Sequence, residues 1–345
     1  MGRFLREERK RQALWRSKTR WLTQRARNGE GFYSKTGGGP YDFCLPQQLA
    51  HENLFEDIRR GALNYFENPP GPLGGSAPIP WHDGGSRLPS THLCDSQVCC
   101  VNFLFPFRFN EAAATALLRL AFDDCFCAVP VQPDTEGLVE FEWLGDPAID
   151  LLGEGSPRQR GAHATSMDVA MCFCDRGRKR HLVLIEWKYT ESYRRSELLG
   201  AGKFGNSPDG AKRRIRYEHL FSAPDSPIDH GRVTFDELGF EPFYQFLRQQ
   251  LLAQALEPEF STARVLHIAP RGNVDFALVT PERLRRENPN SSATNVWFGL
   301  LRVPGRFASA HTEDLFGPLI NSPPAGLERW AEYLRDRYPS ILSST

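Results

Sequence analysis

The chain has no long apolar run. None of its apolar segments reaches the 18 residues or more that indicate a membrane-spanning helix, so we expect no membrane span. The segment MGRFLREERKRQALWRSKTRWLTQRARNG begins with basic residues but has no apolar core of a secretory signal. These two absences predict a cytoplasmic protein.

Motifs for several other chemistries are also missing. There is no G-x-x-x-x-G-K-[ST] loop, which excludes an ATP-driven P-loop. His163 and His181 form neither HxxxH nor HExxH, so zinc hydrolysis is not supported. No two of the eight cysteines have CxxC spacing, and we expect free thiols in a reducing compartment rather than a disulfide framework or a metal cluster.

Positive and negative charges balance over the whole chain but are unevenly distributed along it. The formal net charge is zero, whereas residues 1–30 hold ten Lys or Arg against three Glu. Such a basic segment is typical of phosphate binding, and a solvated leader is the alternative. With the break SKTGGGP after it, we expect a basic, flexible arm over 1–40 and a single α/β domain over 41–345, with its core at about 105–270.

Periodicity predicts the order of elements. A first helix is expected from Leu49 to Glu67, and the segment 68–89, half of it Pro or Gly, is expected to be a loop. There follow, in order, a helix over NEAAATALLRLAFDDCF, strands over GLVEFEWLG, SMDVAMCFCD and HLVLIEWKYTES, a basic helix near 211–221, a helix over EPFYQFLRQQLLAQALE and a strand over ARVLHIAP. The αβββαβ core indicates a mixed central sheet flanked by helices.

The stretch HLVLIEWKYTES carries the most informative chemistry. Its apolar half is typical of a strand buried on both faces, yet Glu186 and Lys188 follow directly. Side chains alternate along a strand, so these two share a face while Trp187 points the other way. Charges are rarely buried unless they are paired or bind something. This strand therefore ends in an ion pair or a catalytic edge.

A neighbouring strand adds a second carboxylate. The basic turn RGRKR between the second and third strands predicts an antiparallel hairpin. With a symmetric turn centred near residue 177.5, Asp168 falls opposite about residue 187. Asp168, Glu186 and Lys188 are thus expected to form one cluster.

An acid followed, across a hairpin, by Glu-x-Lys resembles the PD-(D/E)XK nuclease superfamily, which has a restriction-endonuclease-like fold. The strings HLVLIEWKYTESY, FYQFLRQQLLA and SQVCCVNFLFPF resemble a little-characterised bacterial branch of it. The resemblance covers about 41–301, and its specific part is the block 168–193. One departure is that Met167, not Pro, precedes the acid.

The resemblance implies roles for the clustered residues. Asp168 and Glu186 would bind Mg²⁺, with Mn²⁺ as a substitute, and the backbone carbonyl of Trp187 would be a further ligand. Lys188 would be the catalytic amine, positioning or deprotonating the attacking water and stabilising negative charge. The implied reaction is hydrolysis of phosphodiester bonds, which we expect to be in DNA, by metal-activated water.

Further residues are weaker candidates. We expect Arg158 and Arg160, in the loop before the second strand, to contact the phosphate backbone. Possible auxiliary residues are acids of the helix before the strands and two glutamines of the later helix: Glu111, Asp123, Asp124, Gln245 and Gln249. Glu140 and Glu142 are expected on a solvated strand face, with the approach of one of them to the metal as the alternative, and Tyr189 and Tyr193 are expected either in the core or at the site.

Alternative functions differ in class. A nucleic-acid-binding protein that keeps the fold without catalysis is the main alternative, and a purely structural Glu186–Lys188 ion pair is the simplest. A glycosidase using Glu140 and Glu142 is disfavoured, because alternate residues of one strand would not flank a sugar from both sides. Whether the protein forms a homodimer is left open.

Overall fold

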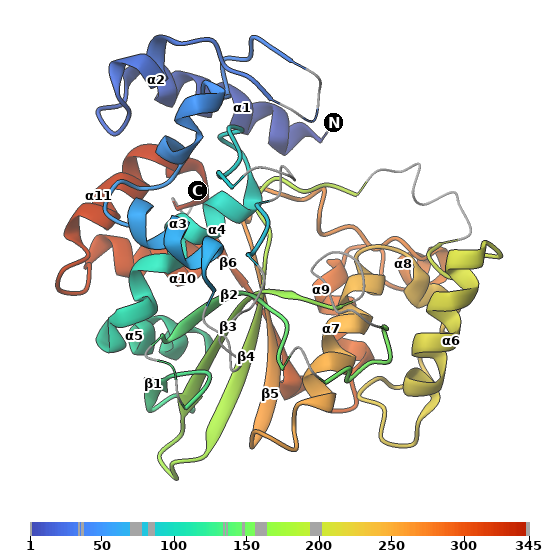
Figure 1. Ribbon diagram of the computed structural model, residues 1–345. Helices are drawn as coiled ribbons and strands as arrows, with labels where there is room; N and C mark the ends of the chain where they lie inside the picture. The colour runs from blue at the N-terminus through green and yellow to red at the C-terminus, as the bar shows by residue number, and fades with distance from the viewer. Residues whose placement is uncertain are drawn as a thin grey trace.

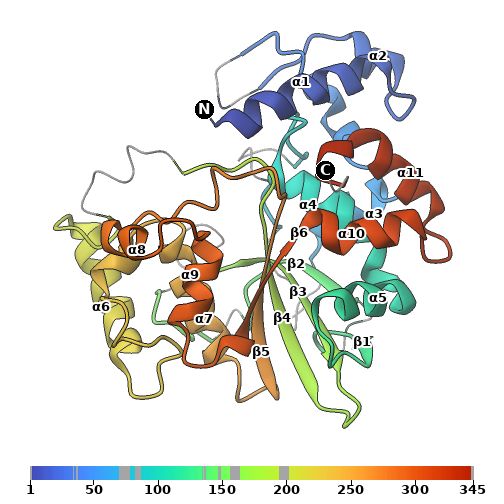
Figure 2. The same cartoon turned by 180° about the vertical axis from the view of Figure 1, so that it is seen from behind.

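A mixed β-sheet runs through the middle of the molecule, and helices cover both of its faces (Figures 1 and 2). The computed structural model describes residues 2–33, 35, 38–69, 78–81, 87–133, 135, 137–146, 149–155, 164–193 and 202–342. Within this part of the chain the sheet has six strands: β1 (Cys127–Val129), β2 (Val139–Trp143), β3 (Met167–Cys174), β4 (Arg180–Trp187), β5 (Thr262–Ala269) and β6 (Phe307–His311). The expected α/β class is confirmed.

The pairing of the strands also follows the predicted order. Strands β1 and β2 both pair antiparallel with β3, and β3 pairs antiparallel with β4. Strands β4, β5 and β6 are parallel neighbours. Two parallel strands need a crossover connection, and two predicted helices lie between β4 and β5. The expected core is present, with β1 and β6 as additional short strands.

The β3–β4 hairpin is tighter than predicted. Val169 pairs with Ile185, so the hairpin is centred on residue 177 rather than 177.5, and position 168 lies opposite 186. Arg178 adopts a left-handed conformation with φ of 62°, and the Asp175 N–H donates to the carbonyl of Lys179. This geometry is typical of a three-residue loop that ends in a left-handed residue. The assumed four-residue turn was therefore wrong by half a residue in its centre.

Eleven α-helices occur in the described residues. They are α1 (Arg3–Lys18), α2 (Gln24–Asn28), α3 (Arg59–Glu67), α4 (Ser96–Leu104), α5 (Glu111–Ala121), α6 (Pro208–Ser222), α7 (Phe243–Ala255), α8 (Glu282–Glu287), α9 (Ala293–Leu300), α10 (Thr312–Asn321) and α11 (Glu328–Arg337). The helix predicted over 49–67 begins only at α3, after a 3₁₀ segment at Gln47–Asn53. None of these helices is long and apolar enough to cross a membrane.

Each face of the sheet has its own apolar core. On one face the odd-numbered side chains of β4, among them Val183, Ile185 and Trp187, pack with helices α3, α4, α5, α10 and α11. On the other face Leu182 and Leu184 pack with α6, α7 and α9. The apolar half of β4 is thus buried on both faces, as its sequence predicts. Glu186 and Lys188 belong to the α6–α7 face and Trp187 to the opposite one.

The N-terminal segment is not the flexible arm that its charge suggested. Residues 3–18 form helix α1, which lies beside α11 (Figures 1 and 2). The Trp15 indole N–H donates to Asp336 at 2.8 Å, and Trp15 is buried. Arg16 is also buried and donates to the carbonyl of Ala26 at 3.0 Å. Several of its basic side chains therefore hold the fold together rather than extending into solvent.

A buried arginine ties this region together. Arg337 of α11 is 1% exposed and donates to the carbonyls of Asn53 and Leu93 and to the hydroxyl of Tyr333. It also donates to the Gln12 side chain of α1 at 3.3 Å. These bonds join α1, α11, the 3₁₀ segment that ends at Asn53 and the stretch before α4 through one side chain. Burial alone would lower the pKa of Arg337, but Tyr333 and Tyr338 raise it overall, so the side chain is charged.

Replacing Arg337 should therefore destabilise the protein. Arg337→Leu leaves several buried carbonyls without a donor, and we expect the free energy of unfolding to fall by about 3–5 kcal/mol. Arg335→Leu, on an exposed position of the same helix, is the matched control and should change it by less than about 0.5 kcal/mol. Urea unfolding of the two variants measures the difference. Equal losses would mean that Arg337 has no special role.

Candidate active site

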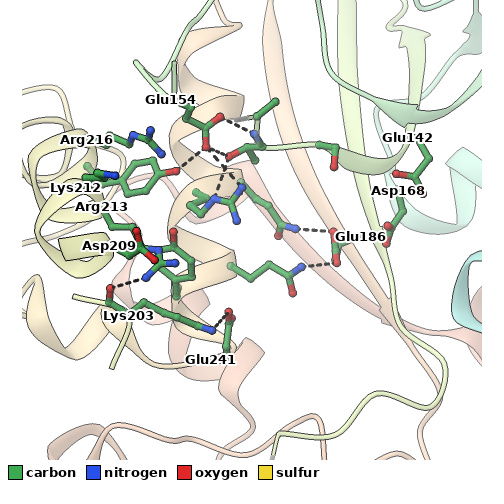
Figure 3. A pocket seen from close by; sticks show the side chains of 18 of the residues that line it. Glu142, Glu154, Asp168, Glu186, Lys203, Asp209, Lys212, Arg213, Arg216 and Glu241 are labelled. Carbon is green, nitrogen blue, oxygen red and sulfur yellow. Dashed lines mark hydrogen bonds and ion pairs between the residues drawn. The ribbon is translucent and has the colours of Figure 1, made fainter. Parts of the chain in front are cut away.

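Glu186, at the end of β4, is a buried carboxylate held by three donors. It is 3% exposed, and the Lys188 ammonium lies 2.6 Å from its Oε1. Gln245 donates to Oε1 at 2.7 Å, and Gln249 donates to Oε2 at 2.6 Å (Figure 3). A carboxylate offers about four acceptor sites, so these three bonds leave room for one further ligand. Glu186 is fixed in place without being saturated.

The two glutamines come from one face of α7. Gln245 and Gln249 are four residues apart, and such residues are neighbours on a helix surface. The Tyr193 hydroxyl donates to Oε1 of Gln245 at 3.3 Å, which turns the Gln245 amide nitrogen toward Glu186. Helix α7 packs in the apolar core on this face of the sheet through residues such as Phe246 and Leu247, which lie between the two glutamines in the sequence. The crossover helix thus positions the Glu186 carboxylate directly.

Asp168, at the start of β3, reaches the same end of the sheet. Its Oδ2 accepts a hydrogen bond from the backbone N–H of Trp187 at 2.7 Å. The ladder between the strands stops at Val169 and Ile185, and the Asp168 side chain bonds to β4 beyond that point. Burial, followed by the charge of Glu186, raises the pKa of Asp168 well above its ordinary value, although Lys188 opposes this.

Lys188 lies below the surface of the site. It is 7% exposed, and its backbone N–H donates to the carbonyl of Ile268 in β5 at 2.8 Å. Burial lowers the pKa of Lys188, but its interactions with Glu186 above all, and with Tyr193, Glu191 and Asp168, raise it by more, so the net shift is upward. The side chain is therefore a buried ammonium paired with Glu186.

A third carboxylate, Glu142 of β2, was expected to be solvated and is instead buried. Its φ is 50°, a left-handed conformation that costs a residue with a side chain roughly 1–2 kcal/mol. Phe141 and Trp143 consequently belong to cores on opposite faces of the sheet, which breaks the usual alternation. The Glu142 carboxylate accepts from Gln97 of α4 at 2.7 Å and lies beside Asp168 (Figure 3).

The three acids share one neighbourhood. Burial is the main cause that raises the pKa of the Cys100 thiol, and the charges of Asp168, Glu142 and Glu186 each raise it further. A strained residue and carboxyl groups of perturbed pKa at one place are characteristic of functional sites. The sequence left open that Glu140 or Glu142 approaches the site but favoured a solvated face, because nothing in VEFEW reveals the left-handed backbone of Glu142.

A cavity of about 760 Å³ opens in front of these carboxylates. Glu142, Asp168 and Glu186 line one side, whereas Lys203 and residues of α6 line the other (Figure 3). Lys188 is not among the lining residues of this cavity. The cavity has the size of ordinary ligand sites. Its acidic wall faces a net basic wall, on which Lys203, Lys212, Arg213 and Arg216 outnumber Asp209 and Glu241 (Figure 3).

The donor set was compared with the needs of a divalent cation. Among the described residues, no three His, Cys, Asp or Glu side chains are grouped closely enough to form a complete metal site. Mg²⁺, however, usually binds one or two protein carboxylates and keeps several waters. Asp168 and Glu186 are hard oxygen donors with acceptor sites left over, and their negative charge is only partly offset. These two carboxylates fit a Mg²⁺ ion that takes its remaining ligands from water.

Other predicted residues lie elsewhere. Glu111 is exposed in the first turn of α5 and is not part of the cavity wall. Asp124 pairs with Arg264 through two hydrogen bonds, which lowers the pKa of the Asp124 carboxyl. Arg158 and Arg160 lie outside the described residues. The eight cysteines are free thiols.

The fold and the cluster of acids at the end of a mixed sheet define a restriction-endonuclease-like α/β protein. The model of the family described as "Restriction Endonuclease associating with ARP" matches residues 9–339, nearly the whole chain. The chain belongs to this family, which supports a nuclease-like function and nucleic-acid binding. Neither the comparison with curated proteins nor that with solved structures finds a match.

Glu140, the other acid of β2, gives a test of burial at this edge. Burial raises the pKa of Glu140 to about 7, opposed by Thr135 and Arg108. Its folded-state pKa lies above the unfolded value of 4.5, so the folded protein binds the proton more tightly and loses stability as pH rises from about 4.5 to 7. Glu140→Gln should remove this loss and stabilise the protein at pH 8 by roughly 2–3 kcal/mol.

Urea unfolding of both proteins at pH 4.5 and pH 8 checks this prediction. The stability difference should be small at pH 4.5, where the carboxyl is protonated in the folded state and half protonated in the unfolded state, and should grow with pH. A difference that is the same at both pH values would contradict a raised pKa for Glu140.

Proposed function

We propose that the protein is a Mg²⁺-dependent nuclease of the PD-(D/E)XK type that hydrolyses phosphodiester bonds in DNA. The observation that carries the proposal is the convergence of Asp168, Glu186 and Lys188 at one end of the β3–β4 hairpin, beside a cavity with an opposing basic wall. The family supports nuclease chemistry in general. The metal, the substrate and the residue roles are the finer part of the proposal.

Asp168 and Glu186 would hold the metal ion, with the backbone carbonyl of Trp187 as a further ligand. Trp187 donates its N–H to Asp168, and the N–H and C=O of one strand residue face the same neighbour. Its carbonyl is therefore directed to the side on which Asp168 lies. When bound, Mg²⁺ would neutralise charge on the scissile phosphate and make bound water a better nucleophile.

Lys188 and the α7 glutamines have separate tasks. The ammonium of Lys188, 2.6 Å from Glu186, stabilises negative charge at this end of the sheet. Gln245 and Gln249 each donate a hydrogen bond to a different oxygen of Glu186 and so fix the orientation of its carboxylate. Side chains that orient a metal-binding carboxylate affect metal affinity almost as strongly as the ligands themselves.

The principal test is cleavage of supercoiled plasmid, linear duplex and RNA with Mg²⁺ or Mn²⁺. Wild type should cut DNA, and Asp168→Asn and Lys188→Met should each lower the cleavage rate by at least about 100-fold, because each removes charge at the reacting phosphate. Glu282→Gln, at an exposed position of α8, is the control and should cut at the wild-type rate.

Two results would count against the proposal. Equal cleavage by wild type, Asp168→Asn and Lys188→Met would show that the site lies elsewhere. Metal-independent DNA binding with no cleavage under any metal would favour a protein that keeps the fold for binding alone.

The pair of hydrogen bonds from Gln245 and Gln249 to Glu186, which we call the glutamine clamp, gives a sharper test of metal binding. Gln249→Leu removes the donor to Oε2 of Glu186 and should raise the Mg²⁺ concentration needed for half-maximal cleavage by about 10–100-fold. Gln250→Leu is the matched control, since Gln250 is equally buried on the same helix and is not bonded to Glu186. If both variants shift the Mg²⁺ requirement equally, general loosening of α7 rather than loss of the clamp explains the effect.

A further inference from the structure

Helix α6 carries cations of two kinds. Arg214 has partners within the protein: it donates to Glu218 at 3.1 Å, pairs with Asp236 and lies over the ring of Phe235. Tyr217 is buried on the same helix in the α6–α7 core. This part of α6 therefore attaches the helix to the domain.

The remaining cations of α6 face the cavity. Lys212, Arg213 and Arg216 line the wall across from Glu142, Asp168 and Glu186 (Figure 3). Lys212 and Arg216 are four residues apart and have no hydrogen-bonded or ion-paired partner among the described residues. Arg213 donates only to the carbonyl of Lys203, at 3.4 Å.

This arrangement has an energetic cost in the protein alone. Like charges three or four residues apart on a helix repel each other, and Asp209, the one carboxylate in the first turn of α6, forms no ion pair with Lys212 or Arg216 in the described part of the chain and offsets their charge only in part. A ligand with several negative charges would relieve that repulsion. Because the acidic wall is the candidate cleavage site, the ligand must run from the carboxylates to α6.

We propose that Lys212, Arg213 and Arg216 bind the phosphate backbone of the DNA strand whose scissile phosphate lies at Asp168 and Glu186. This inference rests on the proposed function for the position of the scissile phosphate. It assigns substrate binding to α6 rather than to the N-terminal basic segment. Contacts of this kind position the strand without reading its sequence.

Salt dependence provides the measurement. Each phosphate contact contributes about −0.9 to the slope of log K against log salt for duplex DNA and about −0.7 for a single strand. Lys212→Gln/Arg216→Gln should therefore weaken the slope by about 1.8 or about 1.4, respectively. Binding is measured with fluorescent duplex and single-stranded DNA between 50 and 200 mM NaCl, without metal, on the full chain carrying Asp168→Asn.

The control removes the same charge from another helix. Arg285→Gln/Arg286→Gln alters two exposed arginines of α8, on the same side of the molecule (Figure 1), outside the cavity wall. We expect this variant to keep the parent salt slope and to lose less than about threefold in affinity. In the active protein, the α6 variant should raise KM at least tenfold while kcat changes by less than threefold.

The outcomes separate this inference from the proposed function. Equal losses for the α6 and α8 variants, or an unchanged slope for the α6 variant, would overturn the role of α6 even if wild type cuts DNA. If the slope of log K against log salt weakens in the α6 variant alone, the result would support the role of α6 even if no cleavage is found. Binding of RNA in preference to DNA, with the same dependence on α6, would overturn the assignment of DNA as the substrate.

Discussion

The buried carboxylate of Glu186 is the group on which the rest of the candidate site depends. Removing a charge from water is costly unless donors replace the water, and here Lys188 comes from the same strand while Gln245 and Gln249 come from the crossover helix. The distance between β4 and α7 is therefore set by hydrogen bonds as well as by apolar packing. Moving α7 by one turn would take both amides away from Glu186, so the position of this helix is tied to the site.

Two further acids make this arrangement poor as a device for stability alone. Asp168 and Glu142 lie beside each other, and Glu142 occupies a strained left-handed conformation. The nearby ammonium of Lys188 is already paired with Glu186, so burial and then the charges of Glu186 and Glu142 raise the pKa of Asp168 despite the opposing effect of Lys188. A cation between the acids would remove this cost. The imbalance, more than the Glu-x-Lys pattern itself, is the physical reason to expect a divalent metal here.

The sequence predicted the parts of the site that depend on local periodicity. The faces of Glu186 and Trp187 follow from alternation along a strand, and a short basic turn was enough to predict the hairpin that brings Asp168 near. Its register was off by one position because a left-handed Arg178 shortens the loop. Glu142 was only a disfavoured alternative because its position depends on a backbone angle. Arg337 was missed because its role depends on contacts with residues far away in the chain.

The local excess of Lys and Arg in the sequence was the least reliable guide to where the protein binds phosphate. The excess of cations in residues 1–30 suggested a phosphate-binding arm, yet Arg16 donates to backbone carbonyls and Arg11 pairs with the buried Glu8. Cations that have intramolecular partners would have to give them up before they bound a phosphate, whereas Lys212 and Arg216 have none to lose among the described residues. The affinity available to a polyanion thus depends on which cations are unpaired and what they face. Arg6, Lys18 and Arg25 have no side-chain partner within the described residues either, but they are outside the wall of the cavity that holds Asp168 and Glu186. The short basic segment of α6 is therefore the better surface for a nucleic-acid strand that reaches this site.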